Sequence, residues 1–191
     1  MKVGVYILAA GASRRLGQPK QLLRFRNSTL LNHVIDTCQR AGFEIVNVIL
    51  GAHHEKIAPS IPEEANILIN NNWNFGMATS IHLAVENISI ENEGILLLVG
   101  DQPGLSVEVL LNMKQEIMEN PVGIISSKYK EGFGPPVFFN KRFFNELKNL
   151  QGDKGAKDLI IREQNEVTYI SFPTGNIDID TEGDLQELSK L

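Results

Sequence analysis

Two runs of apolar residues without polar alternation place the strongest constraint on the fold of this chain. The sequence VGVYILA spans Val3–Ala9, and GILLLV spans Gly94–Val99. A strand with one face in water would alternate apolar and polar residues, so these runs predict strands that are buried on both faces. Both runs are much shorter than the ~20 apolar residues that cross a bilayer. We therefore expect a sheet that helices cover on both sides.

Segments with helical periodicity alternate with the predicted strands. In residues 29–41 apolar side chains recur three or four positions apart, and Gly42 follows where a helix end favours glycine. Residues 77–85 and 106–119 are the next helical segments, the second with a capping serine at its start. Further strands are predicted at residues 45–50, 66–69, 122–126 and 167–172, with an edge strand at 136–139, two short helices after it, and a last helix from about residue 181. This pattern predicts one three-layer α/β/α domain over residues 1–191, Rossmann-like with a mostly parallel sheet.

The composition narrows the class of protein. With 191 residues, of which 42% are hydrophobic, the chain can bury a substantial core. Its net charge of −5 argues against nucleic-acid binding, which requires a basic face. The only cysteine, Cys38, cannot form an internal disulfide and lies on the apolar face of the first predicted helix. The short apolar start runs into Gly-Ala-Ser-Arg-Arg, unlike a signal peptide, so we expect a cytoplasmic protein with no membrane segment.

A glycine-rich, basic loop follows the first predicted strand. Residues 8–20 read LAAGASRRLGQPK. In an open parallel sheet, ligands bind at the carboxyl edge of the strands, where this loop begins. Gly11 and Gly17 allow the backbone to approach a ligand closely, and Arg15 and Lys20 supply positive charge. Together these features favour a polyphosphate ligand.

Two common phosphate-binding motifs do not match this loop. A P-loop requires four residues between its glycines and then Lys-Ser or Lys-Thr, whereas here Lys20 is followed by Gln21. The dinucleotide fingerprint G-x-G-x-x-G is also absent, because Gly11 is followed by Ala12-Ser13. This absence disfavours a Rossmann-type oxidoreductase. The alternative to a phosphate site is a glycine-rich surface turn with solvated basic residues.

The motifs along the chain resemble the molybdenum cofactor cytidylyltransferase family of MobA-like NTP transferases. Leu8-Ala9-Ala10-Gly11 with Ser13, Arg15, Gly17 and Lys20 resembles L-A-A-G-x-S-x-R-x-G-x-x-K. Residues 71–81 resemble N-x-x-W-x-x-G-M-x-x-S-L, residues 101–103 match D-Q-P, residues 152–156 match G-D-x-G-A, and residues 178–185 match D-I-D-T-x-x-D-L. The order and number of these motifs extend the resemblance over the whole chain.

The resemblance implies transfer of a nucleoside monophosphate from a triphosphate to a phosphorylated acceptor, with release of pyrophosphate. Such a reaction depends mainly on positioning and on neutralising charge. By the resemblance, Arg15, Lys20 and Asp101 are the catalytic residues. The nucleotide would be bound by Leu8, Ala9, Ala10, Gly11, Ser13, Gly76, Ser80 and Asp101. The segment from Gly76 to Ser80 would close the far side of the base and ribose, although a capped helix start alone would also explain it.

Magnesium is the expected cofactor, since it prefers carboxylate and phosphate oxygens. Asp101 directly follows the apolar strand 94–99 and therefore lies on the same sheet edge as the loop. An aspartate before a proline also forms turns without any metal. Asp178 and Asp180 share one face of an extended segment, and the resemblance selects Asp180 as the second ligand. The alternative role of Asp180 is to cap the last predicted helix.

The sequence indicates the nucleotide base and the acceptor substrate less directly than it indicates the type of reaction. Guanylyl-transferring relatives carry L-A-G-G, so Ala10 favours CTP over GTP. The family's Gly-His-Pro is replaced by Gly134-Pro135-Pro136, which leaves the acceptor open between molybdopterin and a sugar or polyol phosphate. A non-catalytic nucleotide-binding protein in transient contact with molybdenum enzyme apoproteins is a further alternative. The four histidines show no metal-ligand spacing and are expected to be structural or surface residues.

Overall fold

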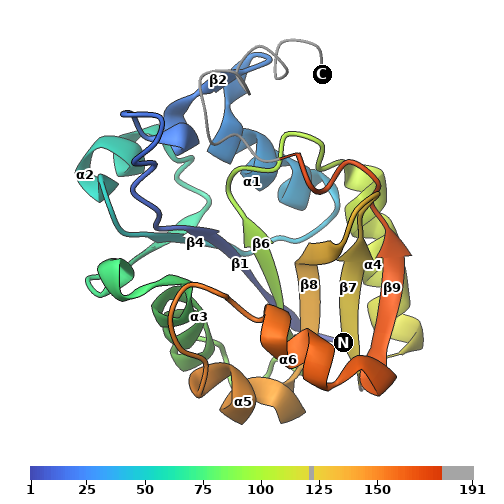
Figure 1. The fold of residues 1–191 in the computed structure, drawn as a ribbon. Helices are drawn as coiled ribbons and strands as arrows, with labels where there is room; N and C mark the ends of the chain where they lie inside the picture. The colour runs from blue at the N-terminus through green and yellow to red at the C-terminus, as the bar shows by residue number, and fades with distance from the viewer. Residues whose placement is uncertain (121–122, 178–191) are drawn as a thin grey trace.

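The central sheet has seven strands in the order β5-β4-β1-β6-β8-β7-β9 (Figure 1). The computed structural model describes residues 1–120 and 123–177. The strands of this sheet are β1 (Val3–Ala9), β4 (Val46–Leu50), β5 (Asn66–Ile69), β6 (Gly94–Val99), β7 (Ile124–Lys128), β8 (Phe133–Asn140) and β9 (Val167–Ser171). Strand β8 is antiparallel to both of its neighbours, and the other pairings in this sheet are parallel. The predicted mostly parallel sheet is therefore confirmed.

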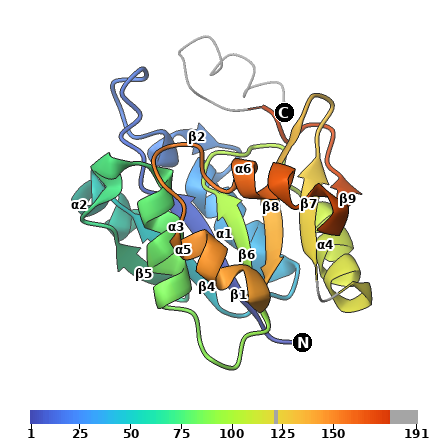
Figure 2. The same ribbon diagram turned by 60° about the horizontal axis from the view of Figure 1, so that its bottom comes forward.

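Helices cover both faces of the sheet (Figures 1 and 2). They are α1 (Leu30–Arg40), α2 (His54–Ile57), α3 (Met77–Glu86), α4 (Val107–Glu119), α5 (Phe144–Lys148) and α6 (Lys157–Arg162). Apolar side chains of α1 and α4 pack in one core cluster, and those of α3, α5 and α6 pack in a second cluster. A small hairpin of β2 (Arg24–Phe25) and β3 (Ser28–Thr29) precedes α1. The three-layer α/β/α architecture is confirmed.

Strand β1 shows why its sequence has no polar alternation. Val5 and Ile7 belong to the cluster beneath α1 and α4, whereas Tyr6 belongs to the cluster beneath α3, α5 and α6. All three side chains are at most 2% exposed. Successive side chains of a strand point to opposite faces, so a strand covered on both faces must be apolar at every position. The expectation for Val3–Ala9 is confirmed.

Capping residues fix the helix boundaries. The hydroxyl of Thr29 accepts a hydrogen bond from the backbone N–H of Asn32 at 3.2 Å, so α1 begins after Thr29. It ends before Gly42, which has the positive φ of 79° typical of a helix C-terminus. Cys38 lies on the buried face of α1, and burial raises the pKa of its thiol to about 12. The predicted helix and the buried cysteine are confirmed.

The predicted edge position of the strand around residues 136–139 is wrong. Strand β8 lies between β6 and β7, and it begins three residues earlier than expected. Its prolines are accommodated by an irregularity: Ser126 pairs with Val137, but Ser127 already pairs with Gly134. On the other side, pairing with β6 reaches only to Val137. Pro135 and Pro136 therefore fall where neither neighbour needs a backbone N–H, which permits prolines inside a sheet.

Two expectations concern segments at the limits of this description. The last predicted helix, from about residue 181, lies outside the described residues, as does Val122 at the start of the predicted strand 122–126.

None of the described helices has the length and apolar character required to span a bilayer.

The cap of α4 provides a test of local stability. The Ser106 hydroxyl accepts a hydrogen bond from the backbone N–H of Val109 at 3.3 Å. We expect Ser106→Ala to lower the free energy of unfolding by about 1 kcal/mol, because an N-terminal N–H loses its partner. Urea denaturation measures the change, and Ser106→Asp, which retains a capping oxygen, serves as the control. Equal losses in both variants would contradict the capping role.

Candidate functional site

A cavity of about 410 Å³ lies at the carboxyl edge of the parallel strands. Residues of the three central strands, β1, β6 and β8, and of several loops line it. On one side these are Leu8, Ala9, Gly11, Lys20 and Gln21, from the end of β1 and the loop that follows it. On the other side are Tyr129, Phe133, Pro135 and Val137 from the β7–β8 region, with Asp153 to Lys157 and Gly175. Asp101 and Gln102 lie between the two sides, directly after β6.

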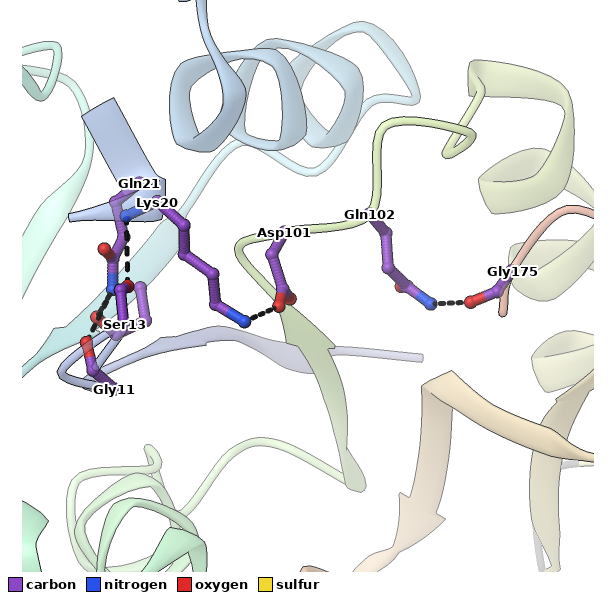
Figure 3. A network of polar contacts seen from close by, with 8 residues as sticks. Gly11, Ser13, Lys20, Gln21, Asp101, Gln102 and Gly175 are labelled. Carbon is purple, nitrogen blue, oxygen red and sulfur yellow. Dashed lines mark hydrogen bonds and ion pairs between the residues drawn. The ribbon is translucent and has the colours of Figure 1, made fainter. Parts of the chain in front are cut away.

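The Lys20–Asp101 ion pair occupies the middle of this edge (Figure 3). The Lys20 ammonium donates a hydrogen bond to Oδ2 of Asp101. The two side chains are only 20% and 13% exposed. Leu8 of β1 pairs with Val99 of β6, so the two loops leave the sheet at the same level. Strand register thus brings together charges that are 81 residues apart in the sequence.

The loop after β1 is held in a fixed conformation by its own side chains. The Ser13 hydroxyl accepts a hydrogen bond from the backbone N–H of Lys20 at 3.0 Å. The Gln21 amide donates to the carbonyls of Ala9 at 2.8 Å and Gly11 at 3.1 Å (Figure 3). A Cβ atom added to Gly11 would meet nothing within 4 Å. The backbone at Gly11 is therefore open to a ligand in the cavity, as the sequence predicts.

The structure brings some of the predicted residues together and separates others. Leu8, Ala9, Gly11, Lys20 and Asp101 line the cavity. Ala10 is buried, and its carbonyl accepts from the backbone N–H of Ala52 at 3.0 Å. Ser13 lines a second hollow of about 690 Å³ on the other side of the loop, together with Arg14, His53 and Trp73. Arg15 lies on the exposed surface of the same loop. Asp178 and Asp180 lie outside the described residues.

The segment from Gly76 to Ile81 borders the cavity through residues that belong to the motif but were not among the predicted nucleotide-binding residues. Met77 and Ile81 line the cavity. The Ser80 side chain is buried instead, where its hydroxyl accepts from the amide of Asn70 at 2.9 Å. The same amide donates to the Thr79 hydroxyl at 2.8 Å. Ser80 therefore ties the start of α3 to the end of β5.

Sequence reasoning missed the residues that build the far side of the cavity. The Gln102 amide donates to the Gly175 carbonyl at 2.8 Å, the Pro135 carbonyl at 3.0 Å and the Tyr129 hydroxyl at 3.1 Å. The Lys157 ammonium lies 5.7 Å from the centre of the Phe133 ring. The D-Q-P motif was the only signal for Gln102, since its contacts come from segments distant in sequence. Pro135 shows what occupies the place of the missing histidine: a carbonyl acceptor in a hydrogen-bonded wall.

A magnesium ion fits the donor set of the described residues in part. The Asp101 carboxylate is a hard oxygen ligand on a cavity wall, beside an open loop backbone. Within residues 1–120 and 123–177 there is no group of three or more His, Cys, Asp or Glu side chains that could hold a metal. This pattern is compatible with an ion held by few carboxylates and by substrate phosphates, the usual arrangement for magnesium.

Two of the four histidines, which were expected to be structural or surface residues, contact backbone carbonyls. His33 Nε2 lies 3.0 Å from the Leu105 carbonyl, and His82 Nε2 lies 3.0 Å from the Leu150 carbonyl. Desolvation lowers the pKa of His33, so its ring is neutral near pH 7. None of the four histidines lines the cavity that contains Lys20.

The fold and the cavity define an α/β protein of the nucleotidyltransferase type. Residues 5–167 match the MobA-like NTP transferase domain, and the chain belongs to this family. The family resemblance seen in the sequence is thereby confirmed.

The chain is also similar to curated relatives and to solved structures over most of its length. Purine catabolism protein PucB of Bacillus subtilis (strain 168) is 28% identical over 167 residues, which cover 83% of this chain and 80% of PucB. Nicotine blue oxidoreductase of Paenarthrobacter nicotinovorans is 35% identical over 133 residues, 69% of this chain and 64% of that protein. The crystal structure of Rv0371c from Mycobacterium tuberculosis H37Rv matches with a TM-score of 0.88 at 29% identity, over 100% of this chain and 98% of that chain. A structure of Rv0371C in complex with manganese matches with a TM-score of 0.84 at 26% identity, over 100% and 99% of the two chains.

Gly76, at the start of α3, packs against the backbone of Gly152 and offers a test of this close contact. Its φ is 107°, and an added Cβ would lie 2.5 Å from the carbonyl group of Gly152. We expect Gly76→Ala to lower the free energy of unfolding by about 1–3 kcal/mol or more, because residues other than glycine rarely adopt this positive φ. Chemical denaturation measures the loss. Gly11→Ala, where the added Cβ meets open space, is the control and should unfold like the wild type.

Proposed function

We propose that this protein transfers CMP from CTP to a phosphorylated acceptor, most directly molybdopterin, with release of pyrophosphate and in dependence on Mg²⁺. The observation that carries this proposal is the Lys20–Asp101 pair in a cavity at the carboxyl edge of the sheet. One residue supplies a cation for phosphate, and the other supplies a carboxylate for a metal, at a single point. Membership of the NTP transferase family supports the same reaction class.

In the proposed reaction, an acceptor phosphate oxygen attacks the α-phosphorus of CTP. The new P–O bond forms as the bond to the β-phosphate breaks, and pyrophosphate leaves with that electron pair. The attacking phosphate is already ionised near neutral pH, so no strong general base is needed. Lys20, a compact charge on a flexible side chain, neutralises the negative charge that grows on the departing pyrophosphate. Arg15 adds positive charge from the same loop.

The chemistry that magnesium would supply here is neutralisation of the charge on the phosphate oxygens of the bound nucleotide. Asp101 would hold it from the described part of the chain, and we propose Asp180 as the second ligand. The manganese complex of Rv0371C supports divalent-metal binding within this fold. In this chain the role of the protein side chains is to orient the triphosphate tail between Lys20 and Asp101.

The choice of CTP rests on the family resemblance, since guanylyl-transferring relatives carry L-A-G-G where this chain has Leu8-Ala9-Ala10-Gly11. The Ala10 methyl group is buried in the core and does not line the cavity, so it would act on base choice only through the shape of the loop backbone. Gly76 and Met77, at the start of α3, would enclose the base and ribose from the opposite side.

The choice of molybdopterin over a sugar phosphate rests on the acceptor side. Val137, Ile160, Leu97 and Val99 provide an apolar floor, and Phe133 an aromatic wall. A sugar carries hydroxyl groups around its whole ring that would lose hydrogen bonds on such a surface, whereas a planar heterocycle has its polar groups at the ring edge and can stack its faces on apolar and aromatic side chains. Lys157, above the Phe133 ring, supplies a positive charge at the mouth.

The similarity to nicotine blue oxidoreductase raises redox chemistry as a second candidate. The loop after β1 lacks the G-x-G-x-x-G fingerprint, so we place this candidate second. The two are distinguished directly: a dehydrogenase binds and turns over a nicotinamide cofactor, while a transferase releases pyrophosphate from a nucleoside triphosphate.

The first test is a turnover screen. We expect pyrophosphate release from CTP and Mg²⁺ only when molybdopterin is present, with GTP, ATP and sugar phosphates giving less. Asp101→Ala should reduce this release about 100-fold or more, because a group that stabilises transition-state charge is lost. Asp158→Ala, which removes an exposed carboxylate paired with Lys154, is the control and should remain active. An Asp101→Ala protein that is unfolded by circular dichroism would instead assign Asp101 a structural role.

The second test concerns competition between Lys20 and a metal for Asp101. The Lys20 ammonium donates a hydrogen bond to this carboxylate and neutralises its charge. We expect Lys20→Met to raise the affinity for Mn²⁺, a stand-in for Mg²⁺, by about tenfold without nucleotide, which corresponds to about 1.4 kcal/mol. Isothermal titration calorimetry measures the affinity. Lys20→Arg retains the charge and should bind Mn²⁺ like the wild type, and equal affinity in all three proteins would contradict the competition.

A further inference from the structure

Each member of the central ion pair is followed in sequence by a buried glutamine. Gln21 follows Lys20, and Gln102 follows Asp101 (Figure 3). Both glutamines are 2% exposed, and both line the cavity. The two side chains extend to opposite sides: Gln21 contacts the loop after β1, and Gln102 contacts the wall at the other end. Two uncharged amides that follow the ion pair in sequence and line the same cavity are candidates for a role in substrate binding.

Gln21 determines the orientation of two peptide groups in the nucleotide loop. Its amide nitrogen donates to the carbonyls of Ala9 and Gly11 at 2.8 and 3.1 Å. In a trans peptide the C=O and the following N–H point in opposite directions. Fixing these two carbonyls therefore also fixes the N–H groups of Ala10 and Ala12. Backbone N–H groups in a glycine-rich loop are the groups that bind phosphate, so their direction affects nucleotide affinity.

Gln102 holds three segments of the opposite wall. Its amide nitrogen contacts the Tyr129 hydroxyl after β7, the Pro135 carbonyl in β8 and the Gly175 carbonyl after β9, at 2.8 to 3.1 Å. All three of these residues line the cavity. Tyr129 also donates to the Pro135 carbonyl, so the wall forms one connected network. The position of this network determines the width of the cavity at its proposed acceptor end.

The hydrogen bonds that the side-chain N–H groups donate determine the orientation of both amides. A reversed amide would place its oxygen against carbonyl oxygens, which cannot donate. In the described part of the chain, Oε1 of Gln21 and Oε1 of Gln102 are buried and have no hydrogen-bond partner. At both positions the contacts are therefore made by the amide N–H groups.

We propose that Gln21 and Gln102 are positioning residues that act on different substrates: Gln21 on the nucleotide through the loop after β1, and Gln102 on the acceptor through the opposite wall. This inference rests on the proposed transferase function. A purely structural role would lower stability and affect both substrates alike. A positioning role changes the KM for one substrate and leaves the KM for the other nearly unchanged.

The test compares Gln21→Met and Gln102→Met, which keep side-chain length and remove the amide. KM for CTP and for molybdopterin is measured with Mg²⁺, together with calorimetric binding of a non-hydrolysable CTP analogue. For Gln21→Met we expect the KM for CTP and the analogue Kd to rise about tenfold, with the molybdopterin KM within about twofold of wild type. For Gln102→Met we expect the reverse, an acceptor KM raised about tenfold with analogue binding unchanged. Thermal unfolding confirms that each variant is folded.

Equal effects of each variant on both substrates, or no effect on either, would overturn the inference. If Gln102→Met does not fold, Tyr129→Phe removes one partner of its amide and decides the acceptor arm. If Gln21→Met does not fold, Gln21→Asn, too short to reach both carbonyls, decides the nucleotide arm. A wild-type protein that fails to bind the analogue and releases no pyrophosphate would refute the transferase function itself. A working wild type with no separation in the variants would refute only the roles of the glutamines.

Discussion

The pairing of β1 with β6 is the constraint on which the site depends. Because Leu8 lies opposite Val99, the loops after the two strands begin side by side, and the Gly100 N–H continues the ladder to the Leu8 carbonyl. A shift by one residue would turn every side chain of β1 to the other face. The apolar character of both faces would not prevent such a slip by itself. The backbone ladder and the Lys20–Asp101 pair together fix the register at the functional edge.

The ion pair also explains how a charged site can exist in a partly dry cavity. Removing either partner of a shielded pair leaves an uncompensated charge, which destabilises a fold much more than replacing both. In the proposed complex each partner exchanges its counter-ion without losing compensation, since phosphate replaces Asp101 for the lysine and a cation replaces Lys20 for the aspartate. The nucleotide-free protein and the proposed substrate complex thus both satisfy the same two groups.

Local sequence signals predicted the fold well, and long-range contacts limited the prediction of the site. The period of the apolar residues located β1, β6 and α1 to within a residue, since each forms by packing its own faces. Strand β8 was placed at the edge because the sequence shows its prolines but not the irregular pairing of Ser126 and Ser127 that accommodates them. The glycine-rich loop, Lys20 and Asp101 were identified through motifs. The contacts of Gln102 could not be, because their partners lie on three segments that only the folded sheet brings together.

The two sides of the cavity therefore differ in how strongly they constrain the sequence. The nucleotide side is built largely from one contiguous loop, residues 8–21, whose backbone must adopt a particular shape, so its sequence forms a recognisable motif. The proposed acceptor side is built from side chains and carbonyls of β8, α6, residues 153–156 and the segments after β7 and β9. Many sequences can produce such a wall, as the replacement of a histidine by Pro135 illustrates. Under the proposed function, acceptor choice on that side can change while the loop and the ion pair stay the same, since function depends on the residues of a site and not on the fold.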